Sequence, residues 1–561
     1  MLMLICKHSR RVTFVVAICF LLSVLPATAA NPDRPNAGKL LDDVGDHKLP
    51  PEAPGTIIIR RPQASAPVVE GPKQKISGIR ITGQDIFGED KLLALVSDAL
   101  GKELSFGELQ APAARLSKYF QDQGYVMADA CILPQESRDG IVEIRVLPGR
   151  YGKIEIVNHS RLSQKVAAGF FDRFKSGDYV KIAPLERAVL TLGDINGVSV
   201  QAELNPGSET GTADLVVELN DTAKVSGQIY VDNWGDRSTG RNRTGLSVRL
   251  GNLGGRGDTV GLEGTYTGSG ENDYSLSYQL PVDGRGTALG VEVSHMHYSL
   301  LGAKYANQNA NGQSRTLSVY ENFVLSRSLD FNLSARIGYS SVKLRDRVDS
   351  TQSDSRKKTS VWTLGLSGDA SDTIGGGGTN NFALTVTRGR LTMGSADAWT
   401  DDAQARTAGS YTKVNLDLGR EQQITPRLSL HLAFTGQLAS KNLDSSEQLG
   451  IGGADSVRAY PAGEVYCDEG YFFTGELRWS LPKPDFQLAA FYDSGKAVLN
   501  KNPWDSSANK RTLTGAGFGL IWTKSDDYKV RLDYAWKISR DPASSDTDKN
   551  GRLWLMGVKY F

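Results

Sequence analysis

The sequence predicts an all-β transmembrane barrel of about sixteen antiparallel strands, preceded by two small α/β units. Three observations predict this fold class. Across residues 223–561, apolar and polar residues alternate in segments of about ten residues, and no helical pattern interrupts them. Glycine accounts for 60 of the 561 residues, which fits a chain rich in strands and turns. Beyond residue 30, no apolar run is long enough for a membrane-spanning helix.

Composition and motifs exclude several functions. Lys and Arg total 64 and Asp and Glu total 63, so the formal net charge is only +1. A nucleic-acid-binding protein needs a basic excess to neutralise phosphates, so no nucleic-acid partner is predicted. The six His are scattered, and neither an H-E-x-x-H nor a G-x-S-x-G motif is present. The sequence therefore predicts no enzyme, no cofactor and no metal site.

The amino-terminal segment is predicted to direct export. Residues 1–29 have the pattern of a signal peptide: basic residues, an apolar core over 14–25, and the cleavage pattern Ala27-Thr28-Ala29. Residues 30–75 contain many prolines and are predicted to form an extended linker. Within this linker, residues 39–44 have the composition of a short helix.

Two α/β units follow the linker. Residues 76–150 have the order strand, helix, helix, strand, strand, and residues 151–222 repeat it. In the first unit, Ser105 and Glu108 form a capping box that should begin the second helix. The similar order and length of the two units indicate an internal repeat.

Residues 223–561 divide into about sixteen alternating segments. The strands are predicted to begin near residues 224, 243, 258, 271, 287, 314, 329, 357, 377, 409, 427, 469, 485, 510, 528 and 550. If the first strand rises from the periplasm, the long connections 300–313, 394–408 and 443–468 lie on the outside. Long external loops and short periplasmic turns are typical of outer-membrane barrels.

One strand and one loop carry the most informative residues. Alternation over 486–493 places Phe491, Asp493 and Gly495 toward the lumen. A carboxylate on the inner wall requires a cationic partner, and Gly495 leaves room for a close approach to the wall. Arg458, in the long loop 443–468, is a candidate for a bidentate pair with Asp493. Alternatively, Arg458 is one of many solvated loop charges.

The motifs resemble a known family, the outer-membrane transporters of two-partner secretion (TpsB type), within the superfamily of the barrel-assembly insertases. Val457-Arg458-Ala459-Tyr460 is similar to the V-R-G-Y loop tip of that superfamily, with Ala459 in place of Gly. Phe491-x-Asp493-x-Gly495 is similar to its F-x-D-x-G strand motif. Residues 185–207 resemble the second POTRA domain of the family. The resemblance covers nearly the whole mature chain.

The resemblance implies a role for each segment. Residues 76–150 and 151–222 would be periplasmic POTRA domains, and a short plug helix would lie at 37–44 within the linker. Loop 443–468 would fold into the lumen of the 223–561 barrel, where Arg458 and Asp493 form a lock. Val457, Tyr460, Phe491 and Gly495 would support this lock.

The implied function is export of a large exoprotein, such as a haemolysin or an adhesin, across the outer membrane of a Gram-negative bacterium, with or without its activation. The POTRA domains would capture the unfolded client, which could add as a strand to a free edge of the third strand. Other expected partners are outer-membrane lipid and the barrel-assembly machinery that inserts the barrel. Two alternatives stay open: a relative of the barrel-assembly insertases, and a passive porin with adaptor domains.

Overall fold

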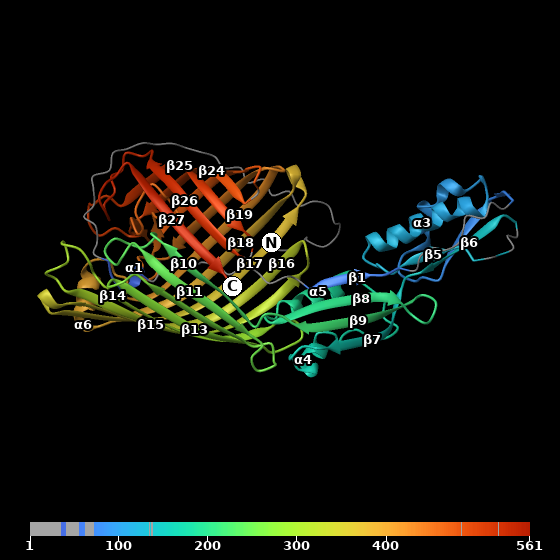
Figure 1. The fold of residues 1–561 in the computed structure, drawn as a ribbon, viewed down its shortest axis with the longest axis horizontal. Coiled ribbons are helices and arrows are strands. Elements are labelled where there is room, and N and C mark those ends of the chain that lie inside the picture. The colour runs from blue at the N-terminus through green and yellow to red at the C-terminus, as the bar shows by residue number, and fades with distance from the viewer. Residues whose placement is uncertain are drawn as a thin grey trace.

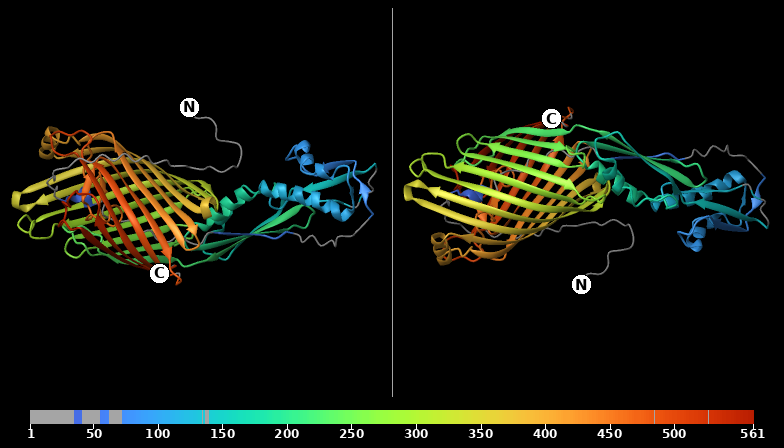
Figure 2. Two further views of the ribbon diagram at one scale, coloured as in Figure 1. Left: turned by 90° about the horizontal axis from the view of Figure 1, so that it is seen from above. Right: turned by 90° about the horizontal axis from the view of Figure 1, so that it is seen from below.

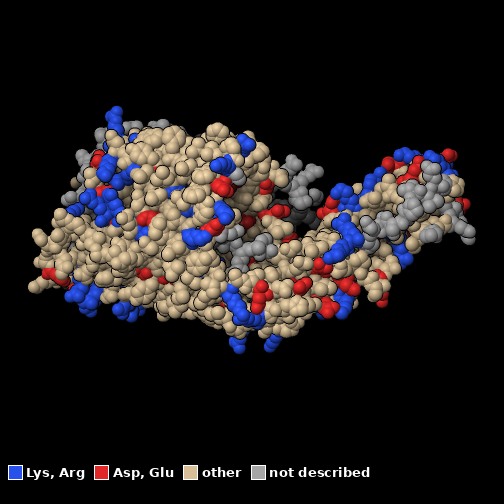
Figure 3. All heavy atoms as spheres, viewed as in Figure 1, with Lys and Arg blue, Asp and Glu red and all other residues tan. Residues whose placement is uncertain are grey.

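The computed structural model describes residues 35–40, 55–61, 72–133, 135, 139–483, 485–525 and 527–561. The predicted signal peptide, residues 1–29, lies outside the described residues, as does most of the linker 30–75. Two α/β units project in line from one end of a large barrel (Figures 1 and 2). Charged side chains gather over these units, whereas broad stretches of the barrel surface carry few of them (Figure 3). This distribution is what a barrel in lipid with units in water requires.

The first α/β unit runs from β2 to β6. Its elements are β2 (Gln74–Lys75), β3 (Gly78–Thr82), α2 (Glu89–Ala94), β4 (Glu103–Leu104), α3 (Phe106–Asp122), β5 (Asp129–Cys131) and β6 (Ile141–Leu147). The predicted capping box is present at the start of α3: Glu108 N donates to the Ser105 hydroxyl, and Ser105 N donates to the Glu108 carboxylate. Leu116 and Phe120 on α3 are fully buried in the core of this unit.

The second unit repeats this plan. Its elements are β7 (Arg150–Asn158), α4 (Gln164–Gly169), α5 (Ile182–Gly193), β8 (Val198–Pro206) and β9 (Thr212–Asp221). The strand order of its sheet is β1-β8-β9-β7, in which β1 (Thr56–Ile59) comes from the linker. Leu185, Ala188 and Leu192 of α5 are fully buried in the core that this sheet shares.

The third strand of each unit lacks the free edge that was expected from the sequence. The order is β3-β6-β5 in the first unit and β8-β9-β7 in the second, so the third strand, β6 or β9, is central. Each pairs in parallel with the first strand of its unit and antiparallel with the second. Because both edges are occupied, an extended client would have to add to a different strand.

The barrel is closed and has the sixteen antiparallel strands predicted. They are β10 (Val225–Asp232), β11 (Arg243–Gly251), β12 (Thr259–Tyr266), β13 (Glu271–Pro281), β14 (Ala288–Ser299), β15 (Ala310–Arg327), β16 (Phe331–Val348), β17 (Ser353–Asp372), β18 (Gly378–Met393), β19 (Gly409–Thr425), β20 (Leu428–Ala439), β23 (Glu469–Ser480), β24 (Phe486–Val498), β25 (Lys510–Lys524), β26 (Tyr528–Lys537) and β27 (Gly551–Tyr560). The largest offsets from the predicted starts occur at β15, 310 against 314, and at β17, 353 against 357. Pairing of β10 with β27 closes the barrel and leaves no open edge.

Two local features of the barrel were not predicted. α6 (Ser395–Ala403) lies in the connection between β18 and β19, where the sequence indicated no helix. None of its residues is buried, so it has no apolar stripe that a periodicity analysis could detect. Within loop 443–468, β21 (Leu449–Ile451) and β22 (Val465–Cys467) form a short antiparallel pair.

In the described part of the chain, no helix has the length and apolar character needed to cross a membrane.

α5 fastens the second unit to one end of the barrel. Arg187 Nη1 and Nη2 donate to the carbonyl oxygens of Leu325 and Val324 on β15, at 3.1 and 2.5 Å. Arg327, at the end of β15, forms a bidentate pair with Asp194, with N···O distances of 2.9 and 2.8 Å. These contacts hold the second unit at the mouth of the barrel.

A short helix from the linker lies inside the barrel. α1 (Ala37–Leu40) packs against the inner faces of β14, β15 and β16, where Ala37 and Leu40 join a cluster that includes Tyr298 and Leu344. Ala37 N donates to Asp346 Oδ1 at 2.8 Å. The remainder of the short helix expected over 37–44 lies outside the described residues.

Candidate functional site

Loop 443–468 folds into the barrel lumen. β21 and β22 form its stem, with Leu449 paired to Cys467 and Ile451 paired to Val465. Gly452 and Gly453 follow β21, both with φ of +115°, a conformation that favours glycine. Beyond this turn, Val457, Ala459 and Tyr460 at the loop tip are fully buried. The tip therefore lies within the protein and not in external solvent.

Arg458 and Asp493 meet in a bidentate pair. Arg458 Nε donates to Asp493 Oδ2 at 2.9 Å, and Nη2 donates to Oδ1 at 2.7 Å. The backbone N of Arg458 also donates to Oδ2 at 3.1 Å, and the Thr474 hydroxyl donates to Oδ1 at 3.0 Å. Arg458 is 3% exposed and Asp493 is 0% exposed. Charge-assisted bonds with this planar geometry are strong and directional.

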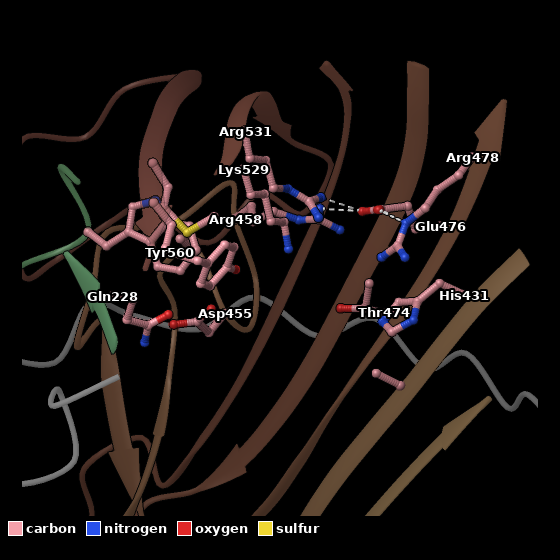
Figure 4. Close-up of a pocket in the computed structure, with 15 residues that line it drawn as sticks. Gln228, His431, Asp455, Arg458, Thr474, Glu476, Arg478, Lys529, Arg531 and Tyr560 are labelled. Carbon is pink, nitrogen blue, oxygen red and sulfur yellow. Dashed lines mark hydrogen bonds and ion pairs between the residues drawn. The ribbon is translucent and has the colours of Figure 1, made fainter. Parts of the chain in front are cut away.

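The same guanidinium reaches two further carboxylates. Arg458 Nη1 donates to Glu476 Oε2 at 2.7 Å and to Asp533 Oδ2 at 3.2 Å. Glu476 lies on β23, Asp493 on β24 and Asp533 on β26. One loop side chain thus joins three barrel strands, and Figure 4 shows Arg458 beside Glu476 and its neighbours.

Two wall arginines balance these carboxylates. Arg531 donates to Glu476 at 2.6 Å and to Asp533 at 2.8 Å, and Arg478 Nε donates to Glu476 Oε1 at 2.7 Å. The group bonded around Glu476, hereafter the lumen cluster, is Arg458, Arg478, Arg531, Glu476, Asp493 and Asp533, and Arg478 Nη1 also donates to Glu421 at 2.9 Å. Arg458 is the cation that is bonded to Asp493. Because a buried unpaired charge is costly, the wall without the loop tip would carry an uncompensated carboxylate.

Aromatic side chains also contact Arg458 and hold the loop tip. Its guanidinium carbon lies 3.3 Å from the centroid of the Phe491 ring, a cation–π contact. Trp554 Nε1 on β27 donates to the backbone carbonyl of Arg458 at 2.7 Å. The Tyr460 hydroxyl lies 2.7 Å from Ser539 Oγ and donates to the carbonyl of Asp541 at 2.8 Å. The loop tip is therefore held through its side chains and its backbone.

Glycines on the wall allow the close approach of the loop. A Cβ at Gly495 would lie 2.8 Å from Cγ2 of Ile451 and 3.2 Å from Cγ2 of Val457. A Cβ at Gly515 on β25 would lie 2.4 Å from Cβ of Ala459. Gly515 therefore leaves the space that the methyl group of Ala459 needs.

A polar cavity of roughly 300 Å³ adjoins the lumen cluster. Its lining includes His431, Asp455, Lys529 and Tyr560 together with Arg458 (Figure 4). These side chains include groups of both charge signs, whereas small-molecule sites are mostly apolar. Such a lining offers both hydrogen-bond donors and acceptors to a polar ligand.

The sequence identified part of this site. The structure places Arg458, Asp493, Phe491 and Gly495 in direct or neighbouring contact, with Val457 and Tyr460 on either side of the tip. Sequence reasoning missed the roles of Glu476, Asp533, Arg531, Arg478 and Trp554. Alternation places the first four on the inner face, but it gives no pairing between strands that are distant in the sequence.

Known proteins share the sequence features of this architecture. Residues 211–521 match the family described as haemolysin secretion/activation protein ShlB/FhaC/HecB, and residues 74–149 match the ShlB-type POTRA domain. The chain is 27% identical to the heme/hemopexin transporter protein HuxB of Haemophilus influenzae (strain 86-028NP), over 99% of this chain and 100% of the relative. It is 24% identical to the outer membrane transporter CdiB of Dickeya dadantii (strain 3937), over 86% of each.

A solved structure has the same fold. CdiB from Escherichia coli superposes with a TM-score of 0.67 and 20% sequence identity, covering 89% of this chain and 92% of that one. The similarity spans the barrel and the periplasmic units together.

Proposed function

The chain belongs to the haemolysin secretion/activation family ShlB/FhaC/HecB, whose members are outer-membrane transporters of two-partner secretion, and we propose that loop 443–468 is the lock of its export pore. As a member it exports a large exoprotein across the outer membrane, with its POTRA domains in the periplasm.

One observation carries the lock: a single loop guanidinium contacts carboxylates on β23, β24 and β26. Arg458 stays positively charged at any physiological pH, so protonation does not release it. Release instead requires new partners for the charges or a movement of the wall. A polypeptide that enters the adjoining polar cavity can supply such partners, because backbone carbonyls and carboxylates accept from guanidinium groups.

We infer that the two α/β units capture the unfolded client before it enters the pore. The second unit is fixed at the barrel mouth through Arg187 and Arg327, and the first unit extends away from the barrel (Figure 2). A client bound along these units would then enter the lumen with one of its ends leading. Folding outside the cell would then prevent its return and supply direction without ATP.

We infer the class of the client from the relatives. Similarity over the whole length to a heme/hemopexin transporter protein supports an exoprotein concerned with heme or hemopexin, alongside the haemolysin and adhesin classes. Outer-membrane lipid and the barrel-assembly machinery are the other proposed partners. We infer no catalytic step, because the family consists of transporters.

Deleting residues 76–150 tests client capture. We expect secretion of the exoprotein to be abolished while the barrel still assembles, because a closed barrel satisfies its own backbone hydrogen bonds. The measurements are exoprotein in the medium and heat-modifiable migration of the transporter on gels. Normal secretion by this variant would contradict the capture role.

The same strains separate the alternatives. A passive porin would conduct small solutes with no effect of the deletion on any exported protein. A barrel insertase would, when depleted, lower the amounts of other outer-membrane barrels, whereas a two-partner transporter would leave them unchanged.

A further inference from the structure

The second α/β unit carries a fourth strand from a distant part of the chain. β1, residues 56–59, pairs in parallel with β8 in the register Thr56↔Gln201 to Ile59↔Leu204. The pairing continues for one more bond, because Arg60 N donates to the carbonyl of Leu204 at 2.8 Å. Figure 1 shows β1 lying along β8 at the edge of this sheet. Without β1, this stretch of β8 would be an open edge with unpaired backbone groups.

The side chains of β1 fit this edge at alternate positions. Ile57 and Ile59 pack on the core of the second unit, opposite the fully buried Ala202 and Leu204. Arg60 Nη2 lies 3.2 Å from Glu203 Oε1 in an exposed ion pair. The β8 edge therefore recognises an extended segment with apolar residues two apart, followed by a cation.

The contact is small enough to be exchanged. β1 has four paired residues, whereas β8 and β9 pair over nine. The Arg60 side chain is 62% exposed, so its ion pair with Glu203 contributes little. A competing strand that forms the same backbone hydrogen bonds would offset most of the free energy lost when β1 leaves.

Another edge of this sheet is less accessible. At the start of β7, Tyr151 N donates to the carbonyl of Asp178, and Gly177 N donates to the carbonyl of Tyr151. The segment 177–180 thus covers the start of the β7 edge. Since the central strand β9 has no free edge, the β8 edge is the better place for strand addition.

We propose that the β8 edge of the second unit is the docking site for an extended client segment, and that β1 occupies it until the client displaces it. This inference rests on the proposed capture of an unfolded client by the α/β units. The client segment would bind parallel to β8, with β-branched or other apolar residues in the places of Ile57 and Ile59. A basic residue would take the place of Arg60 beside Glu203.

The position of β1 couples docking to the barrel lumen. Residues 41–55 connect β1 to α1, which lies inside the barrel. There Ser445 of loop 443–468 donates from its hydroxyl to Oδ1 of Asn36, at 2.8 Å, just before α1. Displacing β1 would free the chain that leads to α1 and to the loop that carries the lock.

A disulfide across the β1–β8 pair tests the exchange in the full-length transporter. Thr56→Cys with Gln201→Cys joins two residues that face each other in register. The matched control, Ser199→Cys with Asn220→Cys, joins β8 to β9 outside the stretch paired with β1 and leaves β1 free to move. We expect the oxidised β1–β8 variant to lose secretion and to recover it on reduction. The β8–β9 variant and the single-cysteine variants should secrete normally in both states.

A peptide probe tests the edge directly. A fluorescent peptide with the sequence of residues 55–61 should bind the full-length variant Ile57→Ser/Ile59→Ser more tightly than wild type, by about tenfold or more, because apparent affinity follows the fraction of open sites. A peptide that carries the same two serines should not bind. Equal binding to both proteins, or normal secretion by a fully cross-linked β1–β8 variant, would overturn the inference. If wild type and all single variants fail to secrete, the proposed function fails instead.

Discussion

Replacing Arg458 by Ala would remove the guanidinium that contacts both carboxylate oxygens of Asp493. Asp493 would keep two donors, the backbone N of residue 458 and the Thr474 hydroxyl. It would nevertheless lose its counter-charge inside the protein. Glu476 and Asp533 would keep their bonds to Arg531, so the uncompensated charge falls mainly on Asp493.

The size of the effect follows from this burial. Removing one partner of a buried ion pair costs on the order of 3–5 kcal/mol. Water in the adjoining cavity would screen the remaining charge and reduce the loss of stability. We therefore expect the free energy of unfolding to fall by about 2–4 kcal/mol, with the loop tip displaced from the wall before the strands separate.

The partner substitution should cost less. Asp493→Ala leaves Arg458 bonded to Glu476 and Asp533, so the guanidinium keeps two counter-charges. In the double-mutant cycle the two losses should not add, with a coupling of about 0.5–3 kcal/mol. A charge swap between positions 458 and 493 should not restore function, because an Asp at 458 would face Glu476 and Asp533.

Three measurements check these expectations: exoprotein secretion, ion conductance in planar bilayers, and denaturant unfolding in detergent. Arg458→Ala should reduce secretion, raise conductance, and keep heat-modifiable migration, because the barrel still closes. Arg420→Ala is the matched control, since Arg420 forms a bidentate pair with Asp372 that is about a quarter exposed. It should change none of the three measurements.

Strict additivity in the cycle would show that Arg458 and Asp493 do not act together. Unchanged conductance and secretion in Arg458→Ala would refute the lock, even if the protein lost stability. An effect of equal size in Arg420→Ala would mean that any lost barrel ion pair disturbs transport.

Three further predictions follow from individual contacts. Gly495→Val should raise conductance and lower secretion, since its side chain would overlap Ile451, whereas Gly475→Val should not, because an added Cβ there meets its nearest neighbour at 3.4 Å. Arg187→Ala should loosen the second unit from the barrel and reduce secretion without affecting barrel assembly, measured as faster proteolysis between unit and barrel. Ser105→Ala removes the helix cap and should destabilise α3 by about 1 kcal/mol, measured as faster amide hydrogen exchange in the first unit.

The sequence by itself determined the barrel and the direction of its side chains. In a barrel in lipid, every backbone N–H and C=O must be hydrogen-bonded to a neighbouring strand, and the outward side chains must be apolar. Apolar and polar residues therefore alternate along the whole strand. For this reason the strand starts and the inward phase of Asp493 could be read from 223–561. The capping box at Ser105 and Glu108 was equally readable, because a helix cap involves residues three apart.

The tertiary structure decided which inward residues meet. Alternation placed Glu476, Arg531 and Asp533 on the lumen wall, but their bonds to Arg458 depend on strand register and on how deeply the loop enters. The addition of β1 to β8 joins residues about 145 positions apart, and no local pattern encodes such a pairing. Local chemistry fixes each strand and cap, whereas the lock and the docked strand arise from contacts between distant segments, which exist only once the barrel has closed and the units have packed.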